Sequence, residues 1–175
     1  MIPPALARKL RNPLLEAHQF TATQFDSRDD KAWFGNHFLK FLASDCPLSL
    51  FSHRFYKRLS QTFGQIAYYD RFGFYGTFFE ATQGRIEFLE QCVQWPCYGD
   101  SGHTYSHVER ALQARMTASE ILDFFKSQLA IETRRSELAN LERLKTKYEP
   151  GQTAPTLNTA AHKPVNYQGD LFAQS

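Results

Sequence analysis

Residues 30–44 read Asp-Lys-Ala-Trp-Phe-Gly-Asn-His-Phe-Leu-Lys-Phe-Leu-Ala-Ser. The large side chains in this stretch recur every three or four positions, at Trp33, Phe34, His37, Phe38, Phe41 and Leu42. This is the period of an amphipathic α-helix, whereas a strand would alternate at every second residue. We therefore predict a helix that begins near Asp30 and ends near Ser44.

The same period continues along the chain and predicts an all-α fold. Apolar residues with helical spacing recur in three further segments, residues 50–63, 82–93 and 121–148. The last of these contains neither Pro nor Gly, which predicts one long C-terminal helix. Pro47 suits the first turn of the second helix. Ser106 and Thr117 each stand three residues before a Glu, which is the capping-box spacing that marks a helix start.

The chain is expected to have four parts. Residues 30–149 form the α-helical domain, which is compact and has an aromatic-rich core, and residues 1–29 form a partly ordered basic arm before it. Residues 150–167 contain prolines and small polar residues, which is typical of a flexible linker. Such a linker has an r.m.s. span of about 20 to 25 Å. Residues 168–175 are the tail.

Charge, cysteine usage and hydropathy limit the classes of protein to which the chain can belong. A net charge of +2 on 175 residues is too small for a strongly basic nucleic-acid binder, so contact with phosphates would need a local patch. No stretch is apolar enough to span a membrane, and the N-terminus does not read as a signal peptide. Three cysteines without a framework spacing favour reduced thiols. We therefore expect a cytoplasmic protein without a membrane partner.

The tail contains the sequence Gln168-Gly-Asp-Leu-Phe172. Two large apolar residues in a polar segment are typical of a peptide that anchors in a partner's pocket. The stretch resembles the pentapeptide by which bacterial replication and repair proteins bind the β sliding clamp. The resemblance implies a clamp-binding role for Gln168, Asp170, Leu171 and Phe172. Gly169 departs from the family pattern, which more often has Leu there. The open alternative is that Leu171 and Phe172 anchor on the chain's own domain.

A second candidate surface combines basic and aromatic residues. Interleaved cations and rings grip single-stranded nucleic acids through phosphate pairing and base stacking. This possible nucleic-acid or partner surface comprises Arg54, Lys57, Arg58, Tyr68, Tyr69, Arg71, Phe74 and Tyr75. The rings are explained more simply as core packing between short helices around the glycines of residues 64–81. A hairpin through residues 71–73 is a further alternative.

Signals for a metal site or for catalysis are weaker. Four residues of the kinds that bind Zn²⁺ lie close in sequence, Cys92, Cys97, His103 and His107, but their spacing does not match a known zinc motif. No nucleophile elbow, phosphate-binding loop or paired-carboxylate motif is present in the sequence. We therefore expect no metal, no cofactor and no enzyme activity.

These observations together predict a non-enzymatic accessory protein of bacterial or phage DNA metabolism, tethered to the sliding clamp through its tail. Its folded domain would act on DNA or on a DNA-bound protein. One alternative is a phage- or plasmid-type inhibitor that blocks a host protein or nucleoprotein through an aromatic surface. A second alternative is a single-stranded nucleic-acid-binding protein.

The expected linker is directly testable by hydrogen exchange. Residues 151–167 should exchange their amide protons without protection in the free protein, because two prolines and small polar side chains cannot offset the entropy of ordering. Strong protection across this span would show that it is folded.

Overall fold

The structure is a computed structural model that describes residues 1–63, 70–94 and 99–149. The expected linker and clamp-binding tail lie outside the described residues, as do Tyr68, Tyr69 and Cys97. The chain divides into two units, Met1–Ser136 and Glu137–Ser175, and each is considered by itself.

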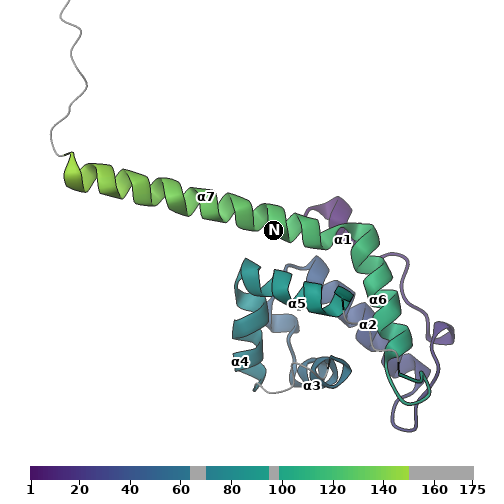
Figure 1. Cartoon of the computed structure of the whole chain (residues 1–175). Helices are drawn as coiled ribbons and strands as arrows, with labels where there is room; N and C mark the ends of the chain where they lie inside the picture. The colour runs from purple at the N-terminus through teal and green to yellow at the C-terminus, as the bar shows by residue number, and fades with distance from the viewer. Residues whose placement is uncertain (64–69, 95–98, 150–175) are drawn as a thin grey trace, which may run out of the picture. The chain divides into compact units, whose positions relative to one another are not determined.

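The described residues form helices and turns, with no strand among them, which confirms the predicted all-α class (Figure 1). The helices are α1 Pro4–Arg11, α2 Arg28–Ala43, α3 His53–Thr62, α4 Arg71–Tyr75, α5 Thr82–Gln94, α6 Ser106–Ser119 and α7 Ile121–Tyr148. Two short 3-10 turns, η1 Ala17–Gln19 and η2 Leu48–Leu50, and a π turn, η4 Gly76–Glu80, connect them.

Helix α2 matches the prediction from residues 30–44 closely. Its N-cap is Ser27, whose hydroxyl accepts a hydrogen bond from Asp30 N at 3.1 Å, while Asp30 Oδ2 accepts one from Ser27 N at 3.1 Å. This reciprocal pair is a capping box and satisfies two backbone donors at the start of the helix. The helix ends at Ala43 because Asp45 and Cys46 adopt positive φ angles of 69° and 54°, which turn the chain toward η2.

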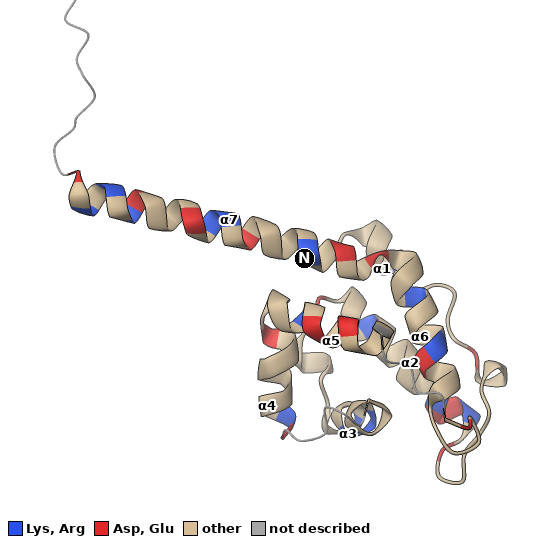
Figure 2. Cartoon of the chain, viewed as in Figure 1, with Lys and Arg blue, Asp and Glu red and all other residues tan. Residues whose placement is uncertain are grey.

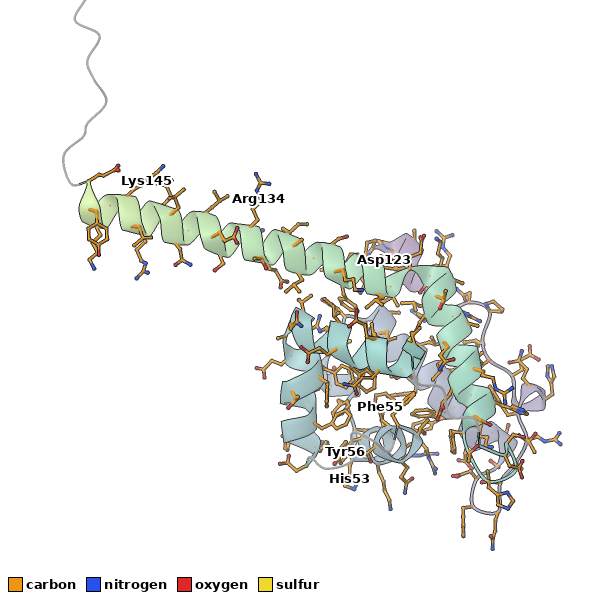
Figure 3. The ribbon with its side chains drawn as sticks, viewed as in Figure 1. His53, Phe55, Tyr56, Asp123, Arg134 and Lys145 are labelled. Carbon is orange, nitrogen blue, oxygen red and sulfur yellow. The ribbon has the colours of Figure 1, made fainter. Side chains whose placement is uncertain are left out.

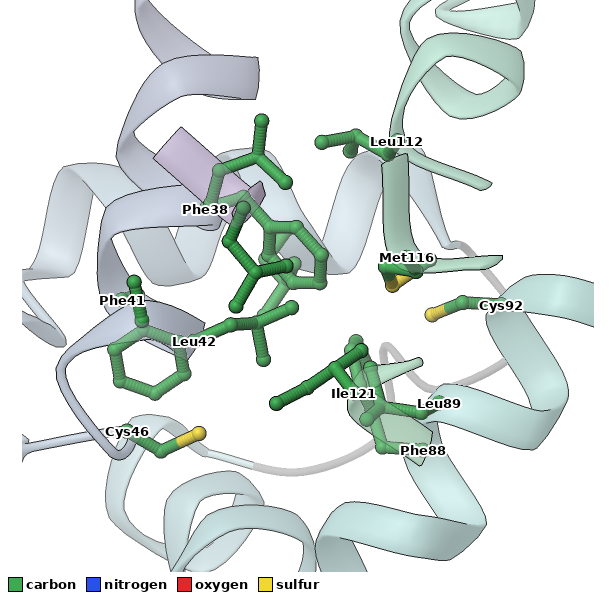
Figure 4. Packing of buried hydrophobic residues seen from close by; sticks show 14 of the residues in the cluster. Phe38, Phe41, Leu42, Cys46, Phe88, Leu89, Cys92, Leu112, Met116 and Ile121 are labelled. Carbon is green, nitrogen blue, oxygen red and sulfur yellow. The ribbon is translucent and has the colours of Figure 1, made fainter. Parts of the chain in front are cut away.

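Phenylalanine side chains from four elements form the centre of the core. Phe41 of α2 meets Phe79 of η4 edge-on, with ring centroids 4.9 Å apart, and Phe79 is 4.9 Å from Phe88 of α5. Phe55 of α3 lies 5.4 Å from Phe41 and points into the interior, whereas His53 of the same helix points away (Figure 3). These are the offset and edge-to-face geometries that aromatic rings prefer. Leu42, Leu89, Leu112, Met116 and Ile121 complete the cluster (Figure 4).

The N-terminal residues are more ordered than the sequence led us to expect. Helix α1 packs against α2 and α6, and Leu10 and Phe20 are buried in the main core. Arg115 of α6 also donates a hydrogen bond from Nη1 to Leu10 O at 3.0 Å. The partly ordered arm predicted for residues 1–29 is thus corrected: Ile2, Leu6 and Leu10 recur at helical spacing, and this short apolar stripe docks the segment.

Three expected helix starts are wrong in detail. Pro47 precedes the 3-10 turn η2, and α3 begins later, at His53, behind Ser52, whose hydroxyl accepts from Phe55 N at 3.2 Å. Ser106 is the first residue of α6, after the N-cap Tyr105, and does not cap it. Thr117 lies in the last turn of α6.

Glu120, the C-cap residue of α6, explains why the helix start predicted at Thr117 is wrong. Glu120 adopts a left-handed conformation with φ 61°. The Thr117–Glu120 spacing therefore marks a helix end, because a left-handed C-cap stops α6 one residue before α7 begins.

The aromatic segment that follows residue 69 is helical and belongs to the core. Asp70 caps α4 through hydrogen bonds from Phe72 N and Gly73 N, at 2.8 and 2.9 Å, so the hairpin alternative is wrong. Gly84 of α5 permits the close packing of α5 on η4, since a Cβ atom there would lie 2.2 Å from the carbonyl oxygen of Thr77.

Helix α7 begins in the core and continues through exposed residues. Ile121 and Phe125 are buried, and residues 130–149 are all exposed. Lysine, arginine and acidic residues alternate along this exposed part (Figure 2). The predicted long C-terminal helix is confirmed. None of the helices in the described part of the chain has both the length and the apolar character needed to cross a membrane.

Truncation of a core ring should be costly, and an exposed ring provides the matched control. Phe79→Ala should lower the free energy of unfolding by about 3 to 5 kcal/mol, because Phe79 is fully buried among other rings. Phe72→Ala, with a ring that is 62% exposed, should change it by about 0.5 kcal/mol or less. Urea unfolding of both variants measures this difference. Equal losses would mean that the ring cluster is not the core.

Candidate functional site

A cleft of about 510 Å³ opens between α2, α3 and the segments that precede α2 and α6. It lies entirely within the first unit. Its walls mix cationic, acidic, hydroxyl and aromatic side chains, with Trp33 on α2 and Tyr105 before α6 as the rings nearest the core. The remaining principal lining residues are Phe25, Asp26, Asp30, Arg54, Lys57, Arg58 and His103.

Helix α3 supplies the basic wall. Arg54, Lys57, Arg58 and Gln61 all line the cleft, and their spacing of three, four and seven residues places them on one face of the helix. Phe55 and Leu59 are fully buried on the other face. The polar face of an amphipathic helix is thereby turned toward the cleft while its apolar face joins the core.

Two of these cations pair with carboxylates across the cleft. Arg58 donates to both oxygens of Asp26, one contact measuring 2.9 Å from Nη1 to Oδ2, and its guanidinium lies 4.8 Å from the ring centre of Tyr105. Arg54 donates to Asp30 Oδ1 at 3.2 Å. Hydrogen bonds from Ser27 to Asp30, aided by the charges of both arginines, hold the pKa of the Asp30 carboxyl below its ordinary value.

Arg54 also stacks on the indole of Trp33, with its guanidinium carbon 4.0 Å from the ring centre. The imidazole of His37, which lies on α2 with Trp33, also stacks on the indole, with ring centres 5.3 Å apart and planes 29° from parallel. His37 Nε2 lies 2.9 Å from Leu50 O, to which it donates a hydrogen bond. The guanidinium of Arg54 therefore packs over Trp33, while the Arg54 side chain stays 66% exposed.

A tight turn places Phe25 at the rim of the cleft. Thr23 Oγ1 accepts hydrogen bonds from Phe25 N at 3.3 Å and from Asp26 N at 2.9 Å, and Thr23 N donates to Asp26 O at 2.8 Å. These bonds orient Asp26 toward Arg58. They leave the Phe25 side chain 86% exposed at the rim of the cleft.

The opposite wall is held in place by a buried lysine. Lys31 is fully buried, and its Nζ donates to Ser101 O at 3.0 Å and to Thr104 O at 2.8 Å. It also lies 5.2 Å from the ring centre of Tyr105. Burial lowers the pKa of Lys31, because desolvation disfavours its charged form. The lysine fixes residues 99–105 against α2 and thereby positions His103 and Tyr105 in the cleft.

A second hollow, of about 330 Å³, adjoins the same tryptophan. It lies between α1 and α2, and its lining includes Trp33, His37, Arg11, Leu14 and Lys40. Leu14 is 64% exposed, and Arg11 and Lys40 are also exposed. Trp33 lines both hollows and so lies at the border between them, and the two hollows together are called the strip over α2 below.

The structure brings together part of the surface predicted from the sequence. Arg54, Lys57 and Arg58 share the cleft. Phe74 is fully buried in the core, which corrects its assignment to a surface. Tyr75 is half-buried and donates a hydrogen bond from its hydroxyl to Cys46 O at 2.9 Å. Arg71 lies over Phe72 on α4, away from the cleft lining.

Sequence reasoning missed several residues of the strip. Trp33 was assigned only to the apolar pattern of α2, although it begins a second stripe, Trp33, His37 and Lys40, at helical spacing. Phe25 gave no signal except that it is an apolar residue within a polar stretch.

The residues considered for zinc are not assembled in the described part of the chain. Cys92 is buried, and burial raises the pKa of its thiol well above the ordinary value. His103 is exposed and its Nδ1 lies 3.0 Å from Asp100 Oδ2, whereas His107 lines a different hollow on α6. Among the described residues no group of three or more His, Cys, Asp and Glu is arranged to hold a metal ion.

Comparisons with known proteins add no relative. No family model, no curated protein and no solved structure matches the chain.

The two ion pairs of the cleft should differ in strength because they differ in burial. The Arg58 and Asp26 side chains are 27% and 11% exposed, against 66% and 42% for Arg54 and Asp30. A double-mutant cycle with alanine should give a coupling of about 1.5 to 3 kcal/mol for the first pair and about 1 kcal/mol or less for the second. Thermal or urea unfolding at low salt measures both. A coupling at Arg54–Asp30 that equals or exceeds the other would contradict this geometry.

Proposed function

We propose that the chain is a non-enzymatic accessory protein of bacterial or phage DNA metabolism, tethered to the β sliding clamp through residues 168–172. The observation that carries the proposal is the sequence Gln168-Gly-Asp-Leu-Phe172, in which two large apolar residues follow a Gln and an acidic residue. These four side chains fit the clamp-binding pattern, and a polar surrounding sequence gives Leu171 and Phe172 few apolar neighbours along the chain.

The position of the peptide along the chain supports tethering. Residues 130–149 at the end of α7 are exposed, so the segment that leads to the peptide leaves the helix from an exposed end. A peptide joined to a domain in this way acts at high effective concentration once either part is bound. Modest affinity, as expected from Gly169 in place of Leu, is then sufficient to keep the domain near the clamp.

The rival function, an inhibitor that blocks a host target through an aromatic surface, has less support among the described residues. The segment that suggested it contributes Phe74, Phe78 and Phe79 to the core. Phe72 is the large ring of this segment that stays more than half exposed among the described residues. A single exposed ring is an ordinary surface feature.

The proposal is tested by the binding of the full chain to a purified bacterial clamp in surface plasmon resonance. Leu171→Ala with Phe172→Ala should abolish binding, because these anchors supply on the order of 3 to 6 kcal/mol of burial. Gly169→Leu should tighten binding by restoring an apolar contact. Gln168→Ala should weaken binding less than the double variant does.

A matched control removes two apolar residues of the expected linker, outside the motif. Leu157→Ala with Val165→Ala should bind the clamp as the parent does. Failure of the parent chain to bind, or equal loss in the control and the motif variant, would show that the peptide is not a clamp ligand. A lower melting temperature in the motif variant would show instead that Leu171 and Phe172 anchor on the domain.

A further inference from the structure

The strip over α2 contains an excess of accessible positive charge. The lining of its two hollows includes five cations, Arg11, Lys40, Arg54, Lys57 and Arg58, and three acidic residues, Asp26, Asp30 and Glu109. Asp26 and Asp30 already accept hydrogen bonds from arginines, and Glu109 is only 3% exposed.

The cations of the strip divide into paired and unpaired groups. Arg11, Lys40 and Lys57 are exposed and form no ion pair with another described residue. Unpaired positive charge is therefore present in both hollows: Lys57 lines the cleft, and Arg11 and Lys40 line the adjoining hollow. An anion with several charges is complementary to it.

Planar groups line the same cleft as Lys57. The guanidinium of Arg54 lies over the Trp33 ring, and the Arg54 side chain is 66% exposed. The ring of Phe25 stands at the rim of the same cleft and is 86% exposed. Bases stack on both aromatic rings and arginine planes when they are freed from a duplex.

We propose that this strip, defined by Arg11, Phe25, Trp33, Lys40, Arg54 and Lys57, binds a single-stranded nucleic acid. Lys57, Lys40 and Arg11 contact phosphates, and Phe25 and the Arg54–Trp33 stack receive unpaired bases. Asp26 and Asp30 keep the arginines oriented and limit the total charge, so that binding depends on stacking as well as on phosphate pairing.

A single strand satisfies this surface better than the other polyanions do. A duplex keeps its bases stacked on one another and offers mainly phosphates to a protein surface. An acidic peptide would pair with the lysines, but its carboxylates are not planar bases that stack on the guanidinium of Arg54. The assignment to DNA rather than RNA rests on the proposed function, because the peptide resembles that of DNA replication and repair proteins.

The test measures fluorescence anisotropy of labelled oligothymidylate of about 12 nucleotides, a length within the range of single-strand sites, with the full chain. Lys40→Ala with Lys57→Ala should weaken binding roughly tenfold. The dependence of the affinity on salt should also become less steep, because a complex that has lost two phosphate contacts releases about 1.4 fewer counterions. Phe25→Ala should weaken binding about fivefold or more, with little change in the salt dependence. Phe25→Trp should retain parental affinity.

The control variants change the same kinds of residue elsewhere. Lys126→Ala removes one positive charge from α7, where the ammonium pairs with Glu90 at 2.8 Å, and Phe72→Ala removes an exposed ring from α4. Both should bind the oligonucleotide as the parent does. Circular dichroism should show an unchanged fold for all variants, because every substituted side chain is exposed.

Each other outcome overturns a stated part of the proposal. Absence of binding at low salt, or equal losses in strip and control variants, would remove the nucleic-acid site altogether. Polyglutamate could compete as effectively as unlabelled oligonucleotide, and Phe25→Ala could leave binding unchanged. These two results together would assign the strip to an acidic protein partner. Tighter binding of oligouridylate than of oligothymidylate would assign it to RNA. Because no clamp is present in these measurements, failure of the nucleic-acid site and failure of clamp binding can be distinguished.

Discussion

The packing of phenylalanine rings between α2, α3, η4 and α5 is the constraint on which the other features depend. Phe41 and Phe55 tie α2 to α3, and Phe79 and Phe88 join η4 and α5 to the same cluster. Rings that meet edge to face leave little freedom for a helix to rotate about its axis. The helical period then determines which side chains remain for the surface.

Helix α2 shows this division most clearly. One stripe, Phe34, Phe38 and Phe41, is fully buried, and the neighbouring stripe, Trp33, His37 and Lys40, lines the two hollows. On α3, the orientation that buries Phe55 and Leu59 places Arg54 and Lys57 in the lining of the cleft. The strip is thus a consequence of core packing, and Lys31 adds the remaining wall by binding two carbonyl groups of residues 99–105.

Much of the helical architecture could be predicted from periodicity, because burial of one helix face leaves a regular trace in the sequence. The long stripe of α2 and the first turns of α7, with Ile121 and Phe125, are of this kind. The docking of α1 was missed because its stripe is short and is interrupted by Pro3 and Pro4. The end of α6 was misread since Thr117 and Glu120 satisfy a capping pattern, and only the left-handed backbone at Glu120 distinguishes an end from a start.

The candidate site could be predicted only in part, for a related reason. The basic face of α3 is local in sequence, so Arg54, Lys57 and Arg58 were identified. Their partners come from other segments: Asp26 is 32 residues from Arg58 in sequence, and Ser101 is 70 residues from Lys31. Such pairings depend on tertiary contacts that no local pattern encodes. Phe74 was misassigned because a ring in an aromatic segment has the same local signature whether it is buried or exposed.

The central proposal is that the tail binds the clamp and the strip binds a single strand, and that neither site blocks the other. It is tested most directly by analytical ultracentrifugation of the chain with a clamp and a labelled oligothymidylate. The account expects all three to sediment as one complex, with the affinity for each partner unchanged by the other. Displacement of the oligonucleotide by the clamp, or of the clamp by the oligonucleotide, would contradict it.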